Sequence, residues 1–224
     1  MRWDFLGSYL PVLADAAVMT LRLSVIAFLA GLLLGFLVAI GRTLGGRAID
    51  AVLRAPVDLL RGTPLLVQLL AWYLVSSALG LPLSPFAAAA IGLSVNAGAF
   101  ISEIVWGGLA SIARGQREAA LSVGLSAAYS VFAIELPQAV PAIVPALIGF
   151  YIGLIKDTSL AYILGLYELT RTAKLISERE FRPLEIYLVI AGIYFLMCFP
   201  LSRLVAVVDR RARSKGMAQA RITI

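Results

Sequence analysis

The stretch GTPLLVQLLAWYLVSSALGLPLSPFAAAAIGLSVNAGAFIS, residues 62–102, decides the fold. It includes no Asp, Glu, Lys or Arg, and a second long stretch, 136–155, lacks them as well. A helix needs roughly 20 mainly apolar residues to cross a hydrocarbon core of about 30 Å. Because backbone groups inside a bilayer must bond within the segment, these runs predict an all-α integral membrane protein with several crossings.

The composition of the whole chain agrees with a membrane protein. Of its 224 residues, 61% are hydrophobic and 14% are charged, whereas soluble domains are about half apolar and about a quarter charged. The chain has no histidine and one cysteine, which removes the usual metal-ligand and catalytic sets. We therefore expect no metal site, no cofactor bound by this chain and no enzymatic activity.

The apolar runs divide into five expected spans within a single transmembrane domain, residues 1–224. Pro82 and Pro85 divide the long neutral stretch into two spans. Three prolines spaced four apart, at 137, 141 and 145, predict a kinked or broken start for the fourth span. The expected spans are 18–40, 64–79, 86–110, 137–155 and 186–208.

Loop charges orient these spans in the membrane. Loops on one side and the C-terminal tail carry twelve basic and five acidic residues, whereas segment 156–185 on the other side carries five of each. Basic loops stay in the cytoplasm, so we expect the C-terminus inside and the N-terminus outside. The net charge of +6 then reflects topology, and we expect no nucleic-acid partner.

The expected cytoplasmic loop 111–136 has a pattern of its own. Two helix-prone pieces meet at Gly124, since glycine adopts backbone angles closed to other residues, and Glu118 lies in the first turn of the earlier piece. A compact helical loop of this kind suits docking to a partner. By itself the pattern also fits an ordinary amphipathic connector.

The spacing around this loop resembles the EAA loop of bacterial ABC importer permeases. Glu118-Ala119-Ala120, Gly124, Ile134 and Leu136-Pro137 carry this resemblance. Further fragments look like the polar amino acid branch of these permeases, and together they extend the similarity over most of the chain. They are residues 61–68 (RGTPLLVQ), 102–104 (SEI), 107–108 (GG), 115–116 (GQ), 136–138 (LPQ) and 156–160 (KDTSL).

The resemblance implies a type I importer permease in the bacterial inner membrane that carries a polar amino acid or similar small zwitterion by alternating access. Expected partners are an ATP-binding cassette ATPase dimer, a second identical or related permease, a periplasmic binding protein docked on segment 156–185, and membrane lipid. The chain contains no phosphate-binding loop, so ATP and Mg²⁺ are expected on the ATPase. The residues expected to couple the two proteins are Glu118, Ala119, Ala120 and Gly124.

Polar residues within the spans are candidates for the substrate pathway, because isolated polar groups are costly in lipid. We expect Gln68, Asn96 and Glu103 to line a cavity in which the carboxylate holds an ammonium group. Interhelical hydrogen bonds, or an ion pair of Glu103 with an arginine such as Arg114, are the alternative. A further set is expected to cap the outer end of the fourth span or to hold a gate: Lys156, Asp157, Thr158 and Ser159.

Two other features have two interpretations each. The pairs Gly31/Gly35 and Gly149/Gly153 allow close helix packing, either between subunits or within the chain. Mixed charges in the outer segment, including Glu178 and Arg179, suit either a docking face or a solvated helix with its own ion pairs.

Other functions fit the sequence less well. A permease of the same kind could instead carry an ectoine- or opine-type solute. An ATP-independent channel or secondary transporter would need no docking loop, and the chain shows no evident internal repeat. An intramembrane enzyme would need clustered catalytic residues that this composition does not supply.

Overall fold

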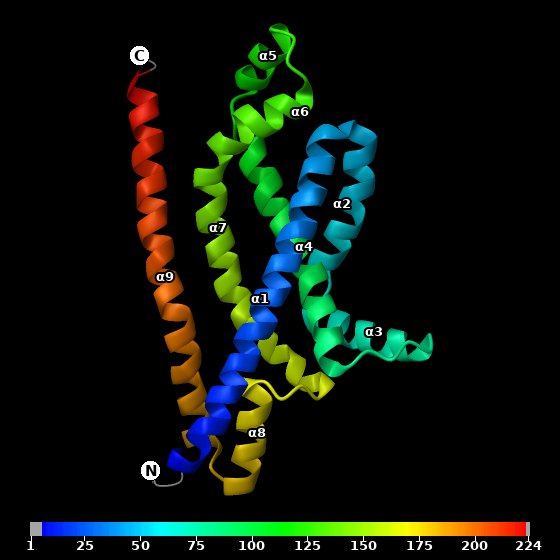
Figure 1. Cartoon of the computed structure of the whole chain (residues 1–224), viewed down its shortest axis with the longest axis vertical. Helices are drawn as coiled ribbons and strands as arrows, with labels where there is room; N and C mark the ends of the chain where they lie inside the picture. The colour runs from blue at the N-terminus through cyan, green and yellow to red at the C-terminus, as the bar shows by residue number, and fades with distance from the viewer. Residues whose placement is uncertain (1–5, 223–224) are drawn as a thin grey trace.

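The computed structural model describes the backbone of residues 6–222 and the side chains of residues 6–210. The two chain ends, on which the predicted N-out, C-in orientation depends, and the basic side chains beyond Arg210 lie outside this part. Throughout the described part the regular structure is helical (Figure 1). The elements are α1 Leu6–Leu44, α2 Gly46–Gly62, α3 Leu65–Ala78, α4 Pro85–Ala110, α5 Arg114–Ser122, α6 Ala127–Tyr129, a π-helical turn η1 Ser130–Glu135, α7 Leu136–Asp157, a 3-10 helix η2 Thr158–Leu164, α8 Leu169–Glu180 and α9 Pro183–Ile222.

Four helical stretches in the described part are long and apolar enough to cross a membrane. They are α1, α4, Ala127–Leu164 and Pro183–Arg210, and the bent pair α2–α3 makes a fifth if it counts as one span. The start of α1 and α8 lie at one end of the bundle, whereas α5, α6 and the last turns of α9 lie at the other (Figure 1). The helices therefore separate two groups of connecting segments, one at each face of the membrane.

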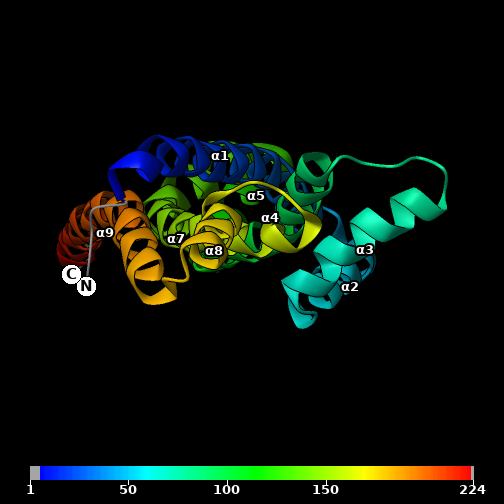
Figure 2. The same ribbon diagram turned by 90° about the horizontal axis from the view of Figure 1, so that it is seen from below.

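The second apolar segment differs most from a simple crossing. Helix α3 begins at Leu65, close to the expected position 64, but its 14 residues extend only about 21 Å, less than a bilayer core. It turns by 106° from α2 at the short break around Pro64. Figure 2 shows both helices projecting to one side of the bundle. The expected span 64–79 thus corresponds to one arm of a bent pair.

Two other spans also differ from the expectation. Helix α1 begins at Leu6, well before the expected start at position 18, because its first turns pack against α8 and α9. Helix α7 contains Pro141 and Pro145 and runs from Leu136 to Asp157 as one helix, so the kinked or broken start was expected where the helix is not broken. The irregular backbone lies just before it, in η1, and Pro137 occupies the first turn, where no intrahelical N–H bond is lost.

The main core forms where α1 crosses α4. A Cβ added to Gly31 would lie 2.6 Å from the Cβ of Ala97, and one added to Gly35 would lie 2.7 Å from the carbonyl oxygen of Gly98. These two glycines therefore pack within the chain. A Cβ added to Gly149 or Gly153 would meet nothing within 4 Å, so that pair of α7 is open in the single chain.

A second core joins the first turns of α1 to α8 and the start of α9. Glu168 lies fully buried beside it and caps α8, where its carboxylate accepts hydrogen bonds from the backbone N–H of Arg171 (2.7 Å) and Thr170 (2.8 Å). The hydroxyl of Tyr194 on α9 lies 3.5 Å from the same carboxylate, and Thr20 of α1 accepts from the N–H of Leu169. Burial raises the pKa of the Glu168 carboxyl to about 7.

This buried carboxyl predicts a pH dependence of stability. Between about pH 4.5 and about pH 7 the folded chain holds a proton that the unfolded chain has lost, so stability falls as pH rises through that window. We expect the melting temperature to fall by on the order of 5–10 °C between pH 5 and pH 8. Thermal unfolding in detergent should show this slope nearly removed in Glu168→Gln and retained in Glu178→Gln, whose carboxylate is exposed on the same helix α8. An unchanged slope in Glu168→Gln would contradict the assignment.

Candidate functional site

The loop between α4 and α7 folds into a compact helical unit, here called the knuckle, made of α5, α6 and η1. Gly124 ends α5 in the left-handed conformation with a φ of +83°. The backbone N–H of Gly124 donates to Leu121 and that of Leu125 to Ala120, which is a glycine cap of a helix C-terminus. The hydroxyl of Ser126 then accepts from the N–H of Tyr129 and starts α6. The knuckle thus has two helical pieces that join at Gly124.

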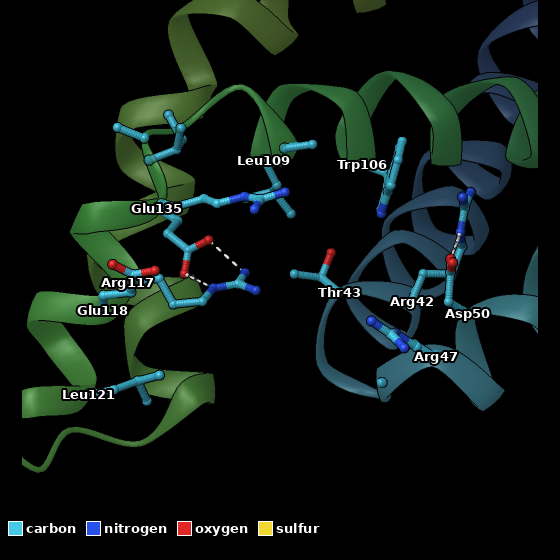
Figure 3. Close-up of a pocket in the computed structure, with 15 residues that line it drawn as sticks. Arg42, Thr43, Arg47, Asp50, Trp106, Leu109, Arg117, Glu118, Leu121 and Glu135 are labelled. Atoms are coloured by element: carbon cyan, nitrogen blue, oxygen red, sulfur yellow. Dashed lines mark hydrogen bonds and ion pairs between the residues drawn. The ribbon is translucent and has the colours of Figure 1, made fainter.

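An arginine and a glutamate fix the shape of the knuckle. Arg117 of α5 donates from Nε (2.9 Å) and Nη2 (2.6 Å) to the two carboxylate oxygens of Glu135 (Figure 3). The hydroxyl of Ser130 donates to the same carboxylate. These hydrogen bonds raise the pKa of the Arg117 guanidinium, which stays charged. Bidentate pairs of this kind are stronger and more directional than single hydrogen bonds. In the sequence both residues count only as loop charges, so this clamp was missed.

The knuckle presents an apolar outer face. Ala120 is buried and anchors α5, whereas Glu118, Ala119 and Gly124 are exposed. Exposed apolar side chains surround them, and Val123 has 74% of its surface accessible. Contiguous exposed apolar patches mark interaction sites in most proteins. The other exposed large apolar side chains of the knuckle are Leu121, which also borders the cavity described below, Tyr129 and Phe132.

A cavity of about 490 Å³ lies between the knuckle, the end of α4 and the corner where α1 meets α2. Figure 3 shows Arg47 and Arg117 reaching into it from opposite walls, with Thr43 between them. This cavity could not be found from the sequence, because its walls come from segments that lie far apart along the chain. Its lining consists of Arg42, Thr43, Gly46, Arg47, Asp50, Trp106, Leu109, Ala110, Ile112, Ala113, Arg114, Arg117, Glu118, Leu121 and Glu135.

Two of the predicted pathway residues meet at the bend between α2 and α3. The amide of Asn96 donates to the side-chain oxygen of Gln68 at 3.1 Å. The Gln68 amide in turn donates to the carbonyl of Leu60 (2.7 Å) and to the carbonyl and hydroxyl of Thr63. These bonds satisfy backbone groups that the 106° bend leaves free, so Gln68 holds the bend and ties it to α4.

Glu103 lies elsewhere, about 10 Å along α4 from Asn96. Its carboxylate pairs with Arg42 of α1 and, at 3.5 Å, with Arg61 of α2. An ion pair with an arginine therefore forms, but the suggested partner Arg114 is wrong, because the arginines of α1 and α2 reach this level first. Arg42 is nearly inaccessible and also pairs with Asp50 at 2.8 Å. Two guanidiniums thus compete with any substrate ammonium for Glu103.

The predicted outer set lies where the helix type changes. Helix α7 ends at Asp157, and the 3-10 helix η2 begins at Thr158. Thr158 is buried and its hydroxyl donates to the carbonyl of Ile155 at 2.7 Å, whereas Lys156 and Asp157 are exposed and Ser159 is half-buried. Thr158 therefore closes the end of α7, and the two charges remain accessible.

On the surface of α8 in the outer segment, Lys174 forms an ion pair with Glu178 at 3.8 Å. Exposed pairs of this kind add little stability. Arg179 is exposed beside it, so this face of α8 remains free for contacts with another molecule.

Comparisons with known proteins cover nearly the whole chain. Residues 31–214 match the family described as binding-protein-dependent transport system inner membrane component. The L-cystine transport system permease protein TcyB of Bacillus subtilis (strain 168) is 37% identical over 211 residues, which cover 93% of this chain and 90% of that protein. The glutamine transport system permease protein GlnP of Escherichia coli (strain K12) is 36% identical over 213 residues, covering 94% and 97%. A crystal structure of an amino acid ABC transporter with histidines superposes with a TM-score of 0.87 at 33% identity, covering 94% of this chain and 99% of that chain.

Proposed function

Because this chain belongs to the family of binding-protein-dependent transport system inner membrane components, we propose that it is the permease of an ATP-driven importer for a polar amino acid or a similar small zwitterion. It is a transport subunit and not an enzyme. The cystine and glutamine permeases among its relatives support the substrate class. Their cargoes are small and carry both an ammonium and a carboxylate, so the shared chemistry is that of a zwitterion.

The observation that carries this proposal is the knuckle. Its apolar outer face, with Leu121 and Val123 exposed, fits a groove on a separate ATPase that holds ATP and Mg²⁺. Glu118, Ala119, Ala120 and Gly124 form the coupling segment in this proposal. The Arg117–Glu135 clamp makes the segment stiff enough to pass a movement of the ATPase on to α4 and α7.

Other surfaces suit the remaining partners. The open Gly149/Gly153 face of α7 allows close approach of a second permease subunit. The exposed charges of α8, including Glu178 and Arg179, suit a periplasmic binding protein. In this proposal the start of α1 lies outside the membrane and the knuckle lies in the cytoplasm. In this proposal Gln68 and Asn96 line the substrate pathway, and residues 156–159 form the outer gate. Glu103 links α4 to α1 and α2 through its ion pairs.

The test is ATP hydrolysis and uptake by this chain, purified with its neighbouring ATPase and binding protein in lipid nanodiscs and vesicles. A panel of polar amino acids should include one that, loaded on the binding protein, stimulates hydrolysis and enters the vesicles. Uptake that persists without ATP or ATPase would overturn the proposal in favour of a channel or secondary transporter.

A further inference from the structure

Four arginines and three carboxylates, those of Asp50, Glu118 and Glu135, line the cavity beside the knuckle. Arg42 pairs with Asp50, and Arg117 pairs with Glu135. The side chains of Arg47 and Arg114, which also line the cavity, form no ion pair or hydrogen bond with any described residue. Arg117 uses Nε and Nη2 on Glu135, so its Nη1 is not engaged in that pair. Guanidinium donors therefore remain available at the walls of an open space.

The cavity lies at the level of the membrane interface. Helix α1 ends at Leu44 and α4 ends at Ala110, so Arg42 and Trp106 are within about 6 Å of the ends of two spanning helices. Tryptophan is enriched at this depth, where lipid headgroups meet the hydrocarbon. Apolar side chains line the rest of the wall, among them Leu109, Ile112 and Leu121. A ligand with an anionic head and an apolar body would meet both kinds of surface.

The unpaired guanidinium donors of the cavity suit a phosphate group. Arginine forks match the tetrahedral oxygens of phosphate, and basic pockets between membrane helices commonly hold anionic headgroups. We propose that this cavity binds a phosphate group through Arg47 and Arg114, with the free Nη1 of Arg117 as a further donor. The phosphate comes from the headgroup of an anionic phospholipid or from free phosphate.

The position of these arginines gives the ligand a structural role. Arg47 lies in the first turn of α2, and Arg114 begins α5. A phosphate held by both would join the α1–α2 corner to the knuckle, and no ion pair between described side chains links these two parts directly. The cytoplasmic location of this link rests on the proposed function, whereas binding itself does not.

Native mass spectrometry of the full chain with its copurifying subunits tests the proposal. Phosphatidylglycerol and inorganic phosphate are titrated separately, with phosphatidylcholine as the zwitterionic comparison. We expect Arg47→Gln/Arg114→Gln to weaken binding of phosphatidylglycerol, or of inorganic phosphate, at least about tenfold, because it removes two of the charged donors that would hold the phosphate. Arg203→Gln/Arg210→Gln is the matched control, because it removes the same two charges from exposed sites on α9, outside the cavity.

The separate titrations distinguish the two sources. Preference for phosphatidylglycerol that depends on the two arginines identifies a lipid, and saturable binding of inorganic phosphate with the same dependence identifies a free anion. Equal binding by the Arg47→Gln/Arg114→Gln variant and the wild type, or an equal loss in Arg203→Gln/Arg210→Gln, would overturn the proposal. A double variant that loses the ATPase but keeps phosphatidylglycerol would also overturn it, in favour of a protein carboxylate in the cavity. Because the readout is ligand binding, these results are independent of whether transport is observed.

Discussion

Replacement of Gly124 by valine is expected to lower ATP-driven uptake at least about tenfold while the partner ATPase still hydrolyses ATP. Gly124 has a φ of +83°, a conformation that a β-branched residue adopts only with strain of about 1–3 kcal/mol. The knuckle relieves this strain by changing the turn between α5 and α6. The proposed coupling segment then no longer matches its groove. Uptake and ATP hydrolysis in the same vesicles measure the loss of coupling.

Two control variants distinguish the effect of backbone strain at Gly124 from the effect of any substitution in the loop. Gly124→Asn should keep most of the uptake, because asparagine tolerates the left-handed conformation better than other residues. Gly115→Ala lies within α5, where a Cβ meets nothing within 4 Å, and should be neutral or slightly stabilising. Full coupling in Gly124→Val would contradict the proposed role of this segment.

Replacement of Gly35 by leucine is expected to have the largest effect on folding. A Cβ at this position would lie 2.7 Å from the carbonyl oxygen of Gly98 and 2.8 Å from two carbon atoms of Ile101. Backbone cannot move aside as a flexible side chain can, so α1 and α4 must separate along the main core. Overpacking typically costs about 1–3 kcal/mol and more where backbone is displaced. We expect a melting temperature lower by on the order of 5–10 °C, or loss of the monodisperse protein, measured by thermal unfolding and gel filtration in detergent.

The matched control is Gly192→Leu on α9. It makes the same substitution in another spanning helix, at a glycine whose added Cβ meets nothing within 4 Å. Its stability should stay close to that of the wild type. Equal effects of the two substitutions would show that the α1–α4 contact does not limit folding.

Much of this architecture could be predicted from the sequence, because apolar runs and Gly124 act locally. Uncharged runs mark where α4 and α7 lie, and Gly124 marks the break in the knuckle. Features that depend on distant segments could not be predicted. The bend at α3 follows from Gln68 bonding back to α2, and the arginines that reach Glu103 come from α1 and α2, far from it along the chain.

The burial of Glu168 had no signal of its own, because its position among mixed charges suggested a solvated helix. Only the packing of α1 and α9 over the start of α8 removes it from water. The cavity beside the knuckle could not be predicted from the sequence for a similar reason. Arg47 and Arg114 come together only after α1, α2 and α5 are in place.

The glycine contact between α1 and α4 also has a mechanical consequence. At Gly31 and Gly35 the two helices pack so closely that neither can slide along the other. They therefore move together as a single rigid lever. One end of this lever joins the knuckle through the short connection 111–113, and the other end is seated against α8. A tilt applied at the knuckle would therefore reach the opposite membrane face through α4 and α1 together.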